Sequence, residues 1–266
     1  MARDSSPTEN ERPRMRPVSD SADRTAEPSS VAVRCDGVTH EYGTGSSGVG
    51  STASRTVTAL RDVSFKVATG DVVGLVGPSG SGKSTALHVI GGLLEPSDGT
   101  VDVLGTDLTE LSGAQRTRLR RDHVGFVFQQ FHLLPALSAR DNVALPLIER
   151  GVARRERQRR AAELLEQVGL DDRMDHLPSE LSGGEQQRVA IARALVADPE
   201  VVLADEPTGE LDTGTGARVL ELLVDVADER TVLVATHDER AMAVTDRVLR
   251  LLDGEVRQTE QFGSEQ

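Results

Sequence analysis

The sequence has few cysteines, aromatic residues and lysines, and each scarcity excludes something. Cys35 is the single cysteine among 266 residues, which excludes a disulfide framework and a cysteine-ligated zinc site and fits a reducing compartment. Six residues are aromatic, five Phe and Tyr42, with no Trp, so Val, Leu, Ile and Ala must pack the core. Only Lys66 and Lys83 accompany 28 arginines, so a lysine in this chain needs an explanation.

Long apolar runs and an excess of positive charge are also missing. No stretch of about 18 consecutive apolar residues is present, so the chain is not expected to span a membrane. The N-terminus lacks the apolar region of a secretory signal. With 43 acidic residues against 30 basic ones, the formal charge is -13, which argues against a nucleic-acid partner because phosphate neutralisation needs clustered cations.

Composition divides the chain into a tail, a long folded region and a short polar end. Residues 1 to about 30 have almost no large apolar side chains and are predicted to be a disordered tail. Residues 31–258 are predicted to fold, with a flexible loop at 43–56 that is rich in Gly, Ser and Thr. Residues 259–266 are predicted to be a polar C-terminal tail.

Apolar strands alternate with helical patterns along the folded region. Apolar runs predict strands at 71–76, 201–204 and 231–235, and a hairpin turn at Asp253 and Gly254. A polar, helix-rich segment at about 130–197 is predicted to be an inserted helical subdomain. One of its helices has an apolar face formed by Ala161, Leu164, Leu165 and Val168.

The most specific single motif is GPSGSGKST at residues 77–85, which fits the P-loop spacing G-x-x-x-x-G-K-[ST]. Glycines let backbone N–H groups fold around phosphate oxygens, and the following helix presents its positive end. Lys83 is expected to bridge the β and γ phosphates, and the Ser84 hydroxyl to ligate Mg²⁺. An ordinary glycine-rich turn is the alternative. The predicted phosphate-binding residues are Gly77, Pro78, Ser79, Gly80, Ser81, Gly82, Lys83, Ser84 and Thr85.

Two carboxylates follow the apolar strand at 201–204. They fall at the carboxyl edge of a predicted parallel sheet, where ligands of open α/β folds bind. Asp205 suits the Mg²⁺ shell, directly or through water, and Glu206 can polarise an attacking water. Acidic residues also favour helix N-termini, so this pair alone leaves both interpretations open.

A second glycine-containing motif, LSGGE, occupies residues 181–185. Ser182 and Glu185 have the spacing of a capping box at the start of a helix. The capping box does not explain Gly183 and Gly184, which lower helix stability in the first turn unless a ligand approaches the N–H groups. The motif therefore predicts a second helix N-terminus that faces phosphate.

Taken together, the P-loop, the carboxylate pair and LSGGE resemble the motifs of the nucleotide-binding subunit of ATP-binding cassette (ABC) transporters. The resemblance covers about residues 31–258, and the pairing of a P-loop with LSGGE, the family's signature motif, is highly specific. It implies an α/β fold: a P-loop NTPase (RecA-like) core with an antiparallel β subdomain and an inserted α-helical subdomain.

The resemblance assigns roles to further residues. Tyr42 resembles the aromatic residue that stacks on adenine, Gln129 the glutamine that links Mg²⁺ and water to the membrane partner, and Asp212 the D-loop aspartate. The implied catalytic residues are Glu206 as general base, His237 as the switch histidine, Gln129 and Lys83. The implied metal ligands are Ser84, Gln129 and Asp205; the nucleotide contacts beyond the P-loop are Tyr42, Ser182, Gly183, Gly184 and Asp212.

Some of these assignments have structural alternatives. Tyr42 could be a strand residue that packs on the sheet. Gln130 is adjacent to Gln129, so the choice between them depends on the resemblance. His237 follows an apolar strand and could cap a helix.

The resemblance also implies partners and a location. Two copies are expected to form a head-to-tail homodimer with ATP between the P-loop of one and the signature motif of the other, with ATP and Mg²⁺ bound. With no membrane span of its own, the chain is expected to act with an integral membrane permease at the cytoplasmic face of the cell membrane. The region around Gln129 is the expected dock, with Phe131 favoured over Phe126 and Phe128 as the contact.

The motifs resemble in particular the ATPases of lipoprotein release, macrolide export, antimicrobial-peptide resistance and cell-division permease complexes. The chain departs from that group at Glu210, where Asn is common. An alternative function is a mechanical signalling ATPase that acts through its permease on an extracytoplasmic partner without transporting a substrate. A DNA-repair or chromosome-organising ATPase is disfavoured by the single cysteine and the short spacing of the motifs, and a degenerate binding module by Glu206 and His237. The sequence identifies no substrate.

Overall fold

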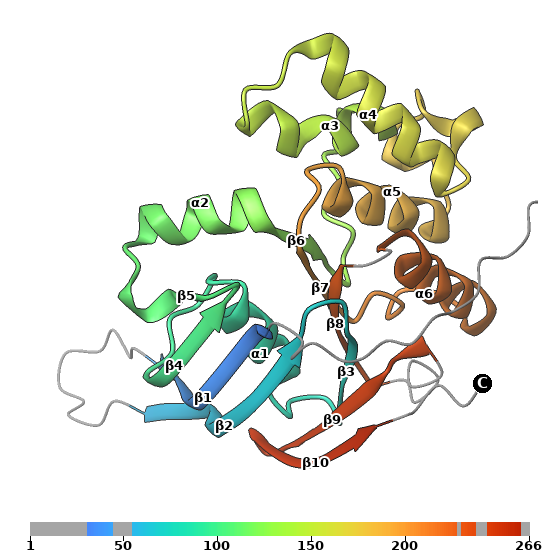
Figure 1. The fold of residues 1–266 in the computed structure, drawn as a ribbon. Helices are drawn as coiled ribbons and strands as arrows, with labels where there is room; N and C mark the ends of the chain where they lie inside the picture. The colour runs from blue at the N-terminus through green and yellow to red at the C-terminus, as the bar shows by residue number, and fades with distance from the viewer. Residues whose placement is uncertain (1–30, 45–54, 228–229, 238–243, 262–266) are drawn as a thin grey trace, which may run out of the picture.

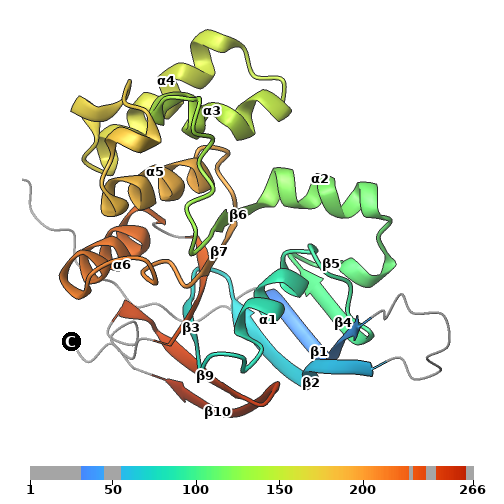
Figure 2. The same ribbon diagram turned by 180° about the vertical axis from the view of Figure 1, so that it is seen from behind.

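The computed structural model describes residues 31–44, 55–227, 230–237 and 244–261 (Figure 1). The predicted N-terminal tail and most of the predicted 43–56 loop lie outside these residues. Within them, two sheets and a group of helices are arranged as separate layers, which the view from behind also shows (Figure 2). No helix among these residues is long and apolar enough to cross a bilayer.

The central sheet has six strands in the order β10-β9-β3-β8-β7-β6. All neighbouring pairs in it are parallel except β9 and β10. β3 and β8 are buried along their whole length, which explains their nearly continuous apolar sequences. The strands are β3 (Val72–Val76), β6 (Val124–Val127), β7 (Val201–Asp205), β8 (Thr231–Thr236), β9 (Arg247–Leu252) and β10 (Glu255–Gln261).

The last two strands form the predicted hairpin. Asp253 and Gly254 lie between them with φ angles of 50° and 81°, the left-handed conformation that a two-residue turn requires. The prediction that a polar tail begins at residue 259 is wrong for residues 259–261. Thr259 and Glu260 pair with Leu249 and Val248, so backbone hydrogen bonding continues the strand although its side chains are polar.

A second, antiparallel sheet packs against the central one with a helix between them. Its strand order is β2-β1-β4-β5, and the helix is α1 (Lys83–Ile90). Leu87 and Ile90 of α1 share one buried apolar cluster with Val33 and Leu60 of this sheet and with Leu203 of β7. This packing fixes the start of α1 relative to both sheets. The strands are β1 (Val31–Thr44), β2 (Arg55–Ala68), β4 (Asp98–Val103) and β5 (Thr106–Asp107).

The helices between β6 and β7 form a layer of their own above the sheet (Figure 1). They are α3 (Ala139–Glu149), α4 (Arg154–Gln167) and α5 (Gly183–Leu195), and short 3-10 turns at Asp171–Arg173 and Pro178–Glu180 connect α4 to α5. The predicted apolar face of α4 is confirmed, since Ala161, Leu165 and Val168 are buried and Leu164 packs against the same cluster. α2 (Gly113–His123) precedes β6, after a 3-10 turn at Leu108–Glu110, and α6 (Thr213–Ala227) follows β7.

α5 joins the helical layer to the sheet because two of its faces are apolar. Val189 and Ala192 pack with α3 and α4, whereas Ile191 and Leu195 pack with α6 and the central sheet. The start of α5 is thereby held at a fixed place relative to β7.

Candidate active site

The loop between β3 and α1 keeps its backbone open to a ligand. Gly82, the residue before α1, has a φ of 105°, and a Cβ on it would lie 2.6 Å from the carbonyl oxygen of Ala59. A side chain would therefore both strain the backbone and collide with β2. The N–H groups of the first turn of α1 have no partners within the helix, and such a helix N-terminus favours phosphate.

The Lys83 side chain lies over this loop and is 5% exposed. Its Nζ donates hydrogen bonds to the carbonyl oxygens of Gly77 (2.8 Å) and Pro78 (3.2 Å) and lies 3.3 Å from Oε1 of Glu206. The ammonium is thus held between the loop and the carboxylate of the residue that follows β7, where it can reach a phosphate bound to the loop.

Asp205, at the end of β7, faces the start of α1. The Ser84 hydroxyl donates a hydrogen bond of 2.8 Å to Asp205 Oδ1, and Nε2 of His88 lies 4.0 Å from Asp205 Oδ2. Burial raises the pKa of the Asp205 carboxyl, and the Ser84 hydrogen bond opposes that rise. His88 was not among the predicted residues, although its position four residues after Ser84 places both on one face of a helix.

Glu206 joins the P-loop lysine to the end of β8. Besides its contact with Lys83, its Oε2 lies 2.8 Å from Nδ1 of His237 and accepts a longer hydrogen bond of 3.4 Å from the His237 N–H. The backbone of Glu206 has a φ of 44°, held in place by a 2.8 Å hydrogen bond from its N–H to the carbonyl of Ala235. A non-glycine residue in this conformation costs about 1–3 kcal/mol, and such outliers cluster at functional sites.

Lys83, Ser84, Glu206 and His237 line a cleft of about 690 Å³. The structure brings together most of the predicted catalytic and P-loop residues there. Gly77 and Ser81 lie beneath it, because Ser81 is buried and a Cβ on Gly77 would fall 2.2 Å from the Leu251 carbonyl. The lining residues are Tyr42, Val57, Thr58, Ala59, Pro78, Ser79, Gly80, Gly82, Lys83, Ser84, Thr85, Gln129, Glu206 and His237.

Tyr42 faces this cleft instead of the sheet core. It is 41% exposed, and its hydroxyl lies 3.3 Å from the hydroxyl of Thr85 on α1. An exposed aromatic ring at one end of a phosphate-binding loop is placed to stack on a nucleotide base.

Gln129 lines the cleft and Gln130 does not. The Gln129 side chain lies across Gly209, where a Cβ would come within 2.9 Å of its Nε2. Its amide also donates a long hydrogen bond of 3.5 Å to Glu210. Glu210, which departs from the related group, therefore contacts a predicted catalytic residue, a proximity that the sequence did not reveal.

The LSGGE segment lies outside the cleft. Ser182 caps α5, with a hydrogen bond of 3.3 Å from the Glu185 N–H to the Ser182 hydroxyl and one of 2.7 Å from the Ser182 N–H to the Glu185 carboxylate. The hydrogen bonds from Ser182 lower the pKa of Glu185. This segment lines a separate pocket of about 500 Å³ together with Arg188, Thr215 and Arg218.

The structure corrects one part of the interpretation of the two glycines. A Cβ on Gly184 would lie 2.6 Å from the Cγ2 of Thr215, and one on Gly183 would lie 3.3 Å from Leu211. Close packing against α6 and the segment before it therefore accounts for Gly184 without a ligand. The exposure of this helix end is then the one remaining reason to expect that it binds phosphate.

Asp212 caps the next helix. Its Oδ1 accepts hydrogen bonds of 3.1 Å from the N–H groups of Gly214 and Thr215 at the start of α6, and the Thr215 contacts lower its pKa. Asp212 does not line the P-loop cleft. In a single chain it therefore acts as a helix cap, beside the LSGGE segment.

The cleft offers the donors that Mg²⁺ prefers. The Ser84 hydroxyl and the Asp205 carboxylate are within hydrogen-bond distance of each other, and the Gln129 amide lines the same space. All three supply oxygen, the ligand type of Mg²⁺. Among the described residues, no group of three or more His, Cys, Asp or Glu side chains is arranged to hold a metal ion.

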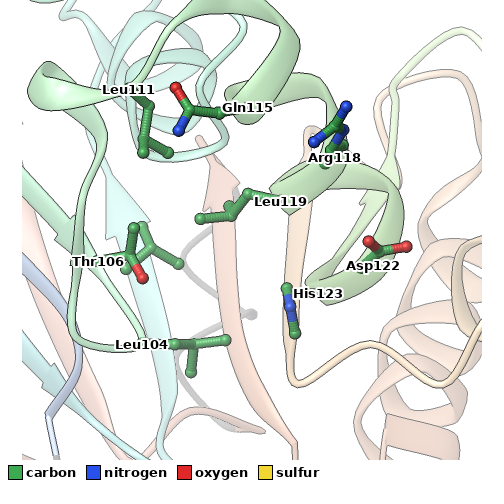
Figure 3. Close-up of a pocket in the computed structure, with 9 residues that line it drawn as sticks. Leu104, Thr106, Leu111, Gln115, Arg118, Leu119, Asp122 and His123 are labelled. Carbon is green, nitrogen blue, oxygen red and sulfur yellow. The ribbon is translucent and has the colours of Figure 1, made fainter.

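A smaller pocket of about 300 Å³ lies between α2 and the turn that joins β4 to β5 (Figure 3). Leu104, Leu111 and Leu119 point into it, with Arg118 and Asp122 at its side. It holds no arrangement of acid, base and phosphate-binding backbone such as the larger cleft provides.

The sequence of this chain is similar to those of known proteins. A family model described as ABC transporter matches residues 60–209. The lipoprotein-releasing system ATP-binding protein LolD of Novosphingobium aromaticivorans is 52% identical over 201 residues, which are 75% of this chain and 90% of that protein. The macrolide export ATP-binding/permease protein MacB of Salmonella typhimurium is 46% identical over 201 residues, 75% of this chain and 31% of that protein.

The solved structures agree with the sequence comparison. The dimeric, post-hydrolysis structure of the ATP-binding cassette MJ0796 bound to ADP and phosphate matches with a TM-score of 0.76 and 41% identity, over 86% of this chain and 98% of that one. The predicted fold class and the predicted group of relatives are confirmed. The chain belongs to the ABC transporter family and is an ATP-binding, ATP-hydrolysing subunit of that family.

Proposed function

We propose that this chain hydrolyses ATP with Mg²⁺ in the P-loop cleft, as a head-to-tail dimer at the cytoplasmic face of the membrane, and thereby drives a separate integral membrane permease. The observation that carries the proposal is the position of Glu206, whose carboxylate lies between Lys83 and His237 in the same cleft as the P-loop.

The cleft binds the two ends of ATP in different ways. The loop N–H groups and Lys83 bind the phosphates, and Tyr42, which lines the same cleft, stacks on the adenine. Ser84, Asp205 and Gln129 would hold Mg²⁺, which when bound neutralises charge on the phosphate oxygens. Phosphate oxygens then replace Glu206 as the partner of the Lys83 ammonium.

Release from Lys83 leaves the Glu206 carboxylate free to act as the general base. A free carboxylate accepts a proton from a water that lies between it and the γ-phosphate. The water oxygen bonds to the γ-phosphorus while the bond to the β–γ bridging oxygen breaks, and ADP and phosphate are the products. The contact of 2.8 Å between Glu206 and His237 orients the carboxylate. General-base catalysis of this kind contributes about 10²–10⁴ to a rate.

A second copy of the chain supplies the remaining contacts with ATP. Ser182, Gly183 and Gly184 lie at a helix end that borders a different pocket from the P-loop cleft, so one chain does not place both phosphate-binding helix ends on the same nucleotide. The dimeric state of the cassette MJ0796, 41% identical to this chain, supports a dimer here. ATP bound between the copies stabilises the dimer, and hydrolysis weakens it.

We propose that the permease docks in a groove beside Gln129. The groove has a volume of about 460 Å³ and is lined by Phe126 and Phe128, whose rings stack 5.3 Å apart. Phe131 does not line it; its carbonyl accepts a hydrogen bond of 2.8 Å from Arg193, and its ring lies near Gly183. We therefore favour Phe126 and Phe128 over Phe131 as the contact, because they line the groove and the Phe131 ring lies near Gly183.

The substitution Glu206→Gln tests the general-base role. It removes the base but keeps the size of the side chain, so we expect ATP binding to persist, phosphate release to fall by at least about 100-fold, and an ATP-dependent dimer to accumulate. Phosphate release and size-exclusion chromatography with light scattering measure the two effects.

Glu221→Gln, the same substitution at an exposed position on α6, serves as the matched control. It is expected to hydrolyse ATP at the wild-type rate. Wild-type turnover by Glu206→Gln would refute the assignment of the base.

A further inference from the structure

The end of β1 that carries Tyr42 is fastened to the segment that follows α1. The Ser97 N–H donates a hydrogen bond of 2.7 Å to the Thr39 carbonyl, and the Glu41 N–H donates one of 3.0 Å to the Ser97 hydroxyl. These two bonds hold residues 39–41 against the stretch of chain at 95–97. The backbone just before Tyr42 therefore has a fixed position relative to the P-loop helix.

His40 adds a side-chain contact at the same place. Its ring is 7% exposed, and its Nδ1 lies 2.8 Å from the carbonyl oxygen of Glu95. Because a carbonyl oxygen can only accept, Nδ1 carries the hydrogen of this bond. The hydrogen bond fixes the rotation of the imidazole.

The fixed imidazole meets the ring of Tyr42. His40 and Tyr42 are two residues apart on β1 and so lie on the same face of the strand. Their ring centroids are 4.7 Å apart with an interplanar angle of 81°, the edge-to-face arrangement that aromatic pairs prefer. The Tyr42 hydroxyl is 3.3 Å from the Thr85 hydroxyl, so the ring is held by the imidazole and at its hydroxyl end.

We infer that His40 is a positioning residue that holds the Tyr42 ring in place to stack on the base of the nucleotide. The inference rests on the proposed function, in which Tyr42 stacks on adenine. Without this support, the exposed Tyr42 ring would rotate freely before ATP binds. Losing that freedom on binding costs free energy and weakens the affinity for ATP. His40 contacts Tyr42 and does not line the P-loop cleft, so its effect is confined to binding of the adenine.

Two ligands separate this role from a general structural one. Equilibrium binding of ATP depends on the stacked base, whereas binding of inorganic tripolyphosphate depends on the P-loop alone. His40→Asn keeps a donor for the Glu95 carbonyl but loses the ring, and we expect it to weaken ATP binding roughly fivefold and to leave tripolyphosphate binding unchanged. The KM for ATP should rise by a similar factor, with kcat unchanged at saturating ATP.

A double-substitution cycle tests whether His40 acts through Tyr42. In a Tyr42→Ala background, His40→Asn is expected to have no further effect on ATP affinity. His40→Phe restores an aromatic ring and is expected to bind ATP within about twofold of wild type. His123→Asn, the same substitution on α2 away from the cleft, is the matched control and should not change affinity.

The outcomes distinguish a failure of adenine stacking by Tyr42 from a failure of the positioning role of His40. If Tyr42→Ala leaves ATP affinity unchanged, adenine stacking in the proposed function is wrong. If Tyr42→Ala weakens ATP binding and His40→Asn does not, the inference about His40 is overturned. Equal losses for ATP and tripolyphosphate, or an effect of His40→Asn that persists without Tyr42, would also overturn it. Should His40→Asn fail to fold, weak ATP binding by a folded His40→Phe would decide against the inference.

Discussion

The start of α1 and the start of α5 are both glycine-containing helix ends with unpaired backbone N–H groups, but their surroundings differ. At α1, Lys83 and Glu206 line a cleft, and Asp205 accepts a hydrogen bond from Ser84 in the same lining. At α5, Ser182 and Glu185 satisfy each other in a capping box, and the neighbouring pocket contains no carboxylate pair with a hydroxyl partner.

The two helix ends also differ in how far contacts within the single chain stabilise the carboxylates beside them. Asp205 is a partly buried carboxyl with a raised pKa, and Glu206 has a left-handed backbone. Glu185 has a lowered pKa because Ser182 donates to it. The strained backbone and the raised pKa are thus found at the α1 end, whereas the α5 end is stabilised by its own capping box.

Of the substitutions that distinguish the start of α1 from the start of α5, Lys83→Ala is expected to have the largest effect. It removes the only ammonium in the cleft lining and leaves Glu206 without this partner, so we expect ATP affinity to fall by about 100-fold or more. Equilibrium binding of a fluorescent ATP analogue measures the loss. Unchanged affinity would show that the cleft is not the primary phosphate site.

A smaller effect on binding is expected from Ser182→Asp. Aspartate caps helices as well as serine does, so α5 should remain intact, but its charge repels phosphates brought by a second copy. We expect ATPase activity to fall at least about tenfold, while ATP binding to the isolated chain and the unfolding temperature stay near wild type. Normal activity would show that the α5 end takes no part in the ATP site.

The smallest effects are expected on stability, with opposite signs at the two ends. Glu185 has a lowered pKa, so its ionised form stabilises the fold above its unfolded pKa and this contribution is lost as pH falls through the folded one. Glu185→Ala should therefore lower the free energy of unfolding at pH 7 by about 1 kcal/mol, a difference that shrinks toward pH 4.

Asp205 behaves in the opposite way. Its raised pKa means that the fold binds the proton more tightly, so stability is lost as pH rises through the folded pKa. Asp205→Asn should therefore raise the stability of the protein without nucleotide at pH 7, and the gain should disappear at acidic pH. Urea unfolding at several pH values measures both variants, and a destabilised Asp205→Asn would contradict the comparison.

Local sequence patterns predicted the parts of the fold and site that depend on near neighbours. The P-loop spacing placed Lys83 and Ser84, the apolar run before Asp205 and Glu206 placed both carboxylates, and the turn residues placed the β9–β10 hairpin. In each case the chemistry of a few consecutive residues decides the conformation.

Contacts between distant segments were not predictable in the same way. The closeness of Gly184 to Thr215 depends on how α5 packs on α6. The contact between Gln129 and Glu210 joins a residue that precedes β7 in the sequence to one that follows it. The groove that Phe126 and Phe128 line is completed by residues of α3 and α5, which are distant in the sequence. Such placements follow from tertiary packing, which residue spacing does not encode.

In the proposed dimer, each ATP site needs the α1 end of one copy and the α5 end of the other. Mixing Lys83→Ala with Ser182→Asp tests it, because a mixed dimer has one site in which both ends are intact. Each variant alone should be nearly inactive, and the mixture should recover roughly a quarter of wild-type ATPase activity, since half of the dimers are mixed and each has one intact site of two. A mixture no more active than the separate variants, or Ser182→Asp that is fully active alone, would contradict the account.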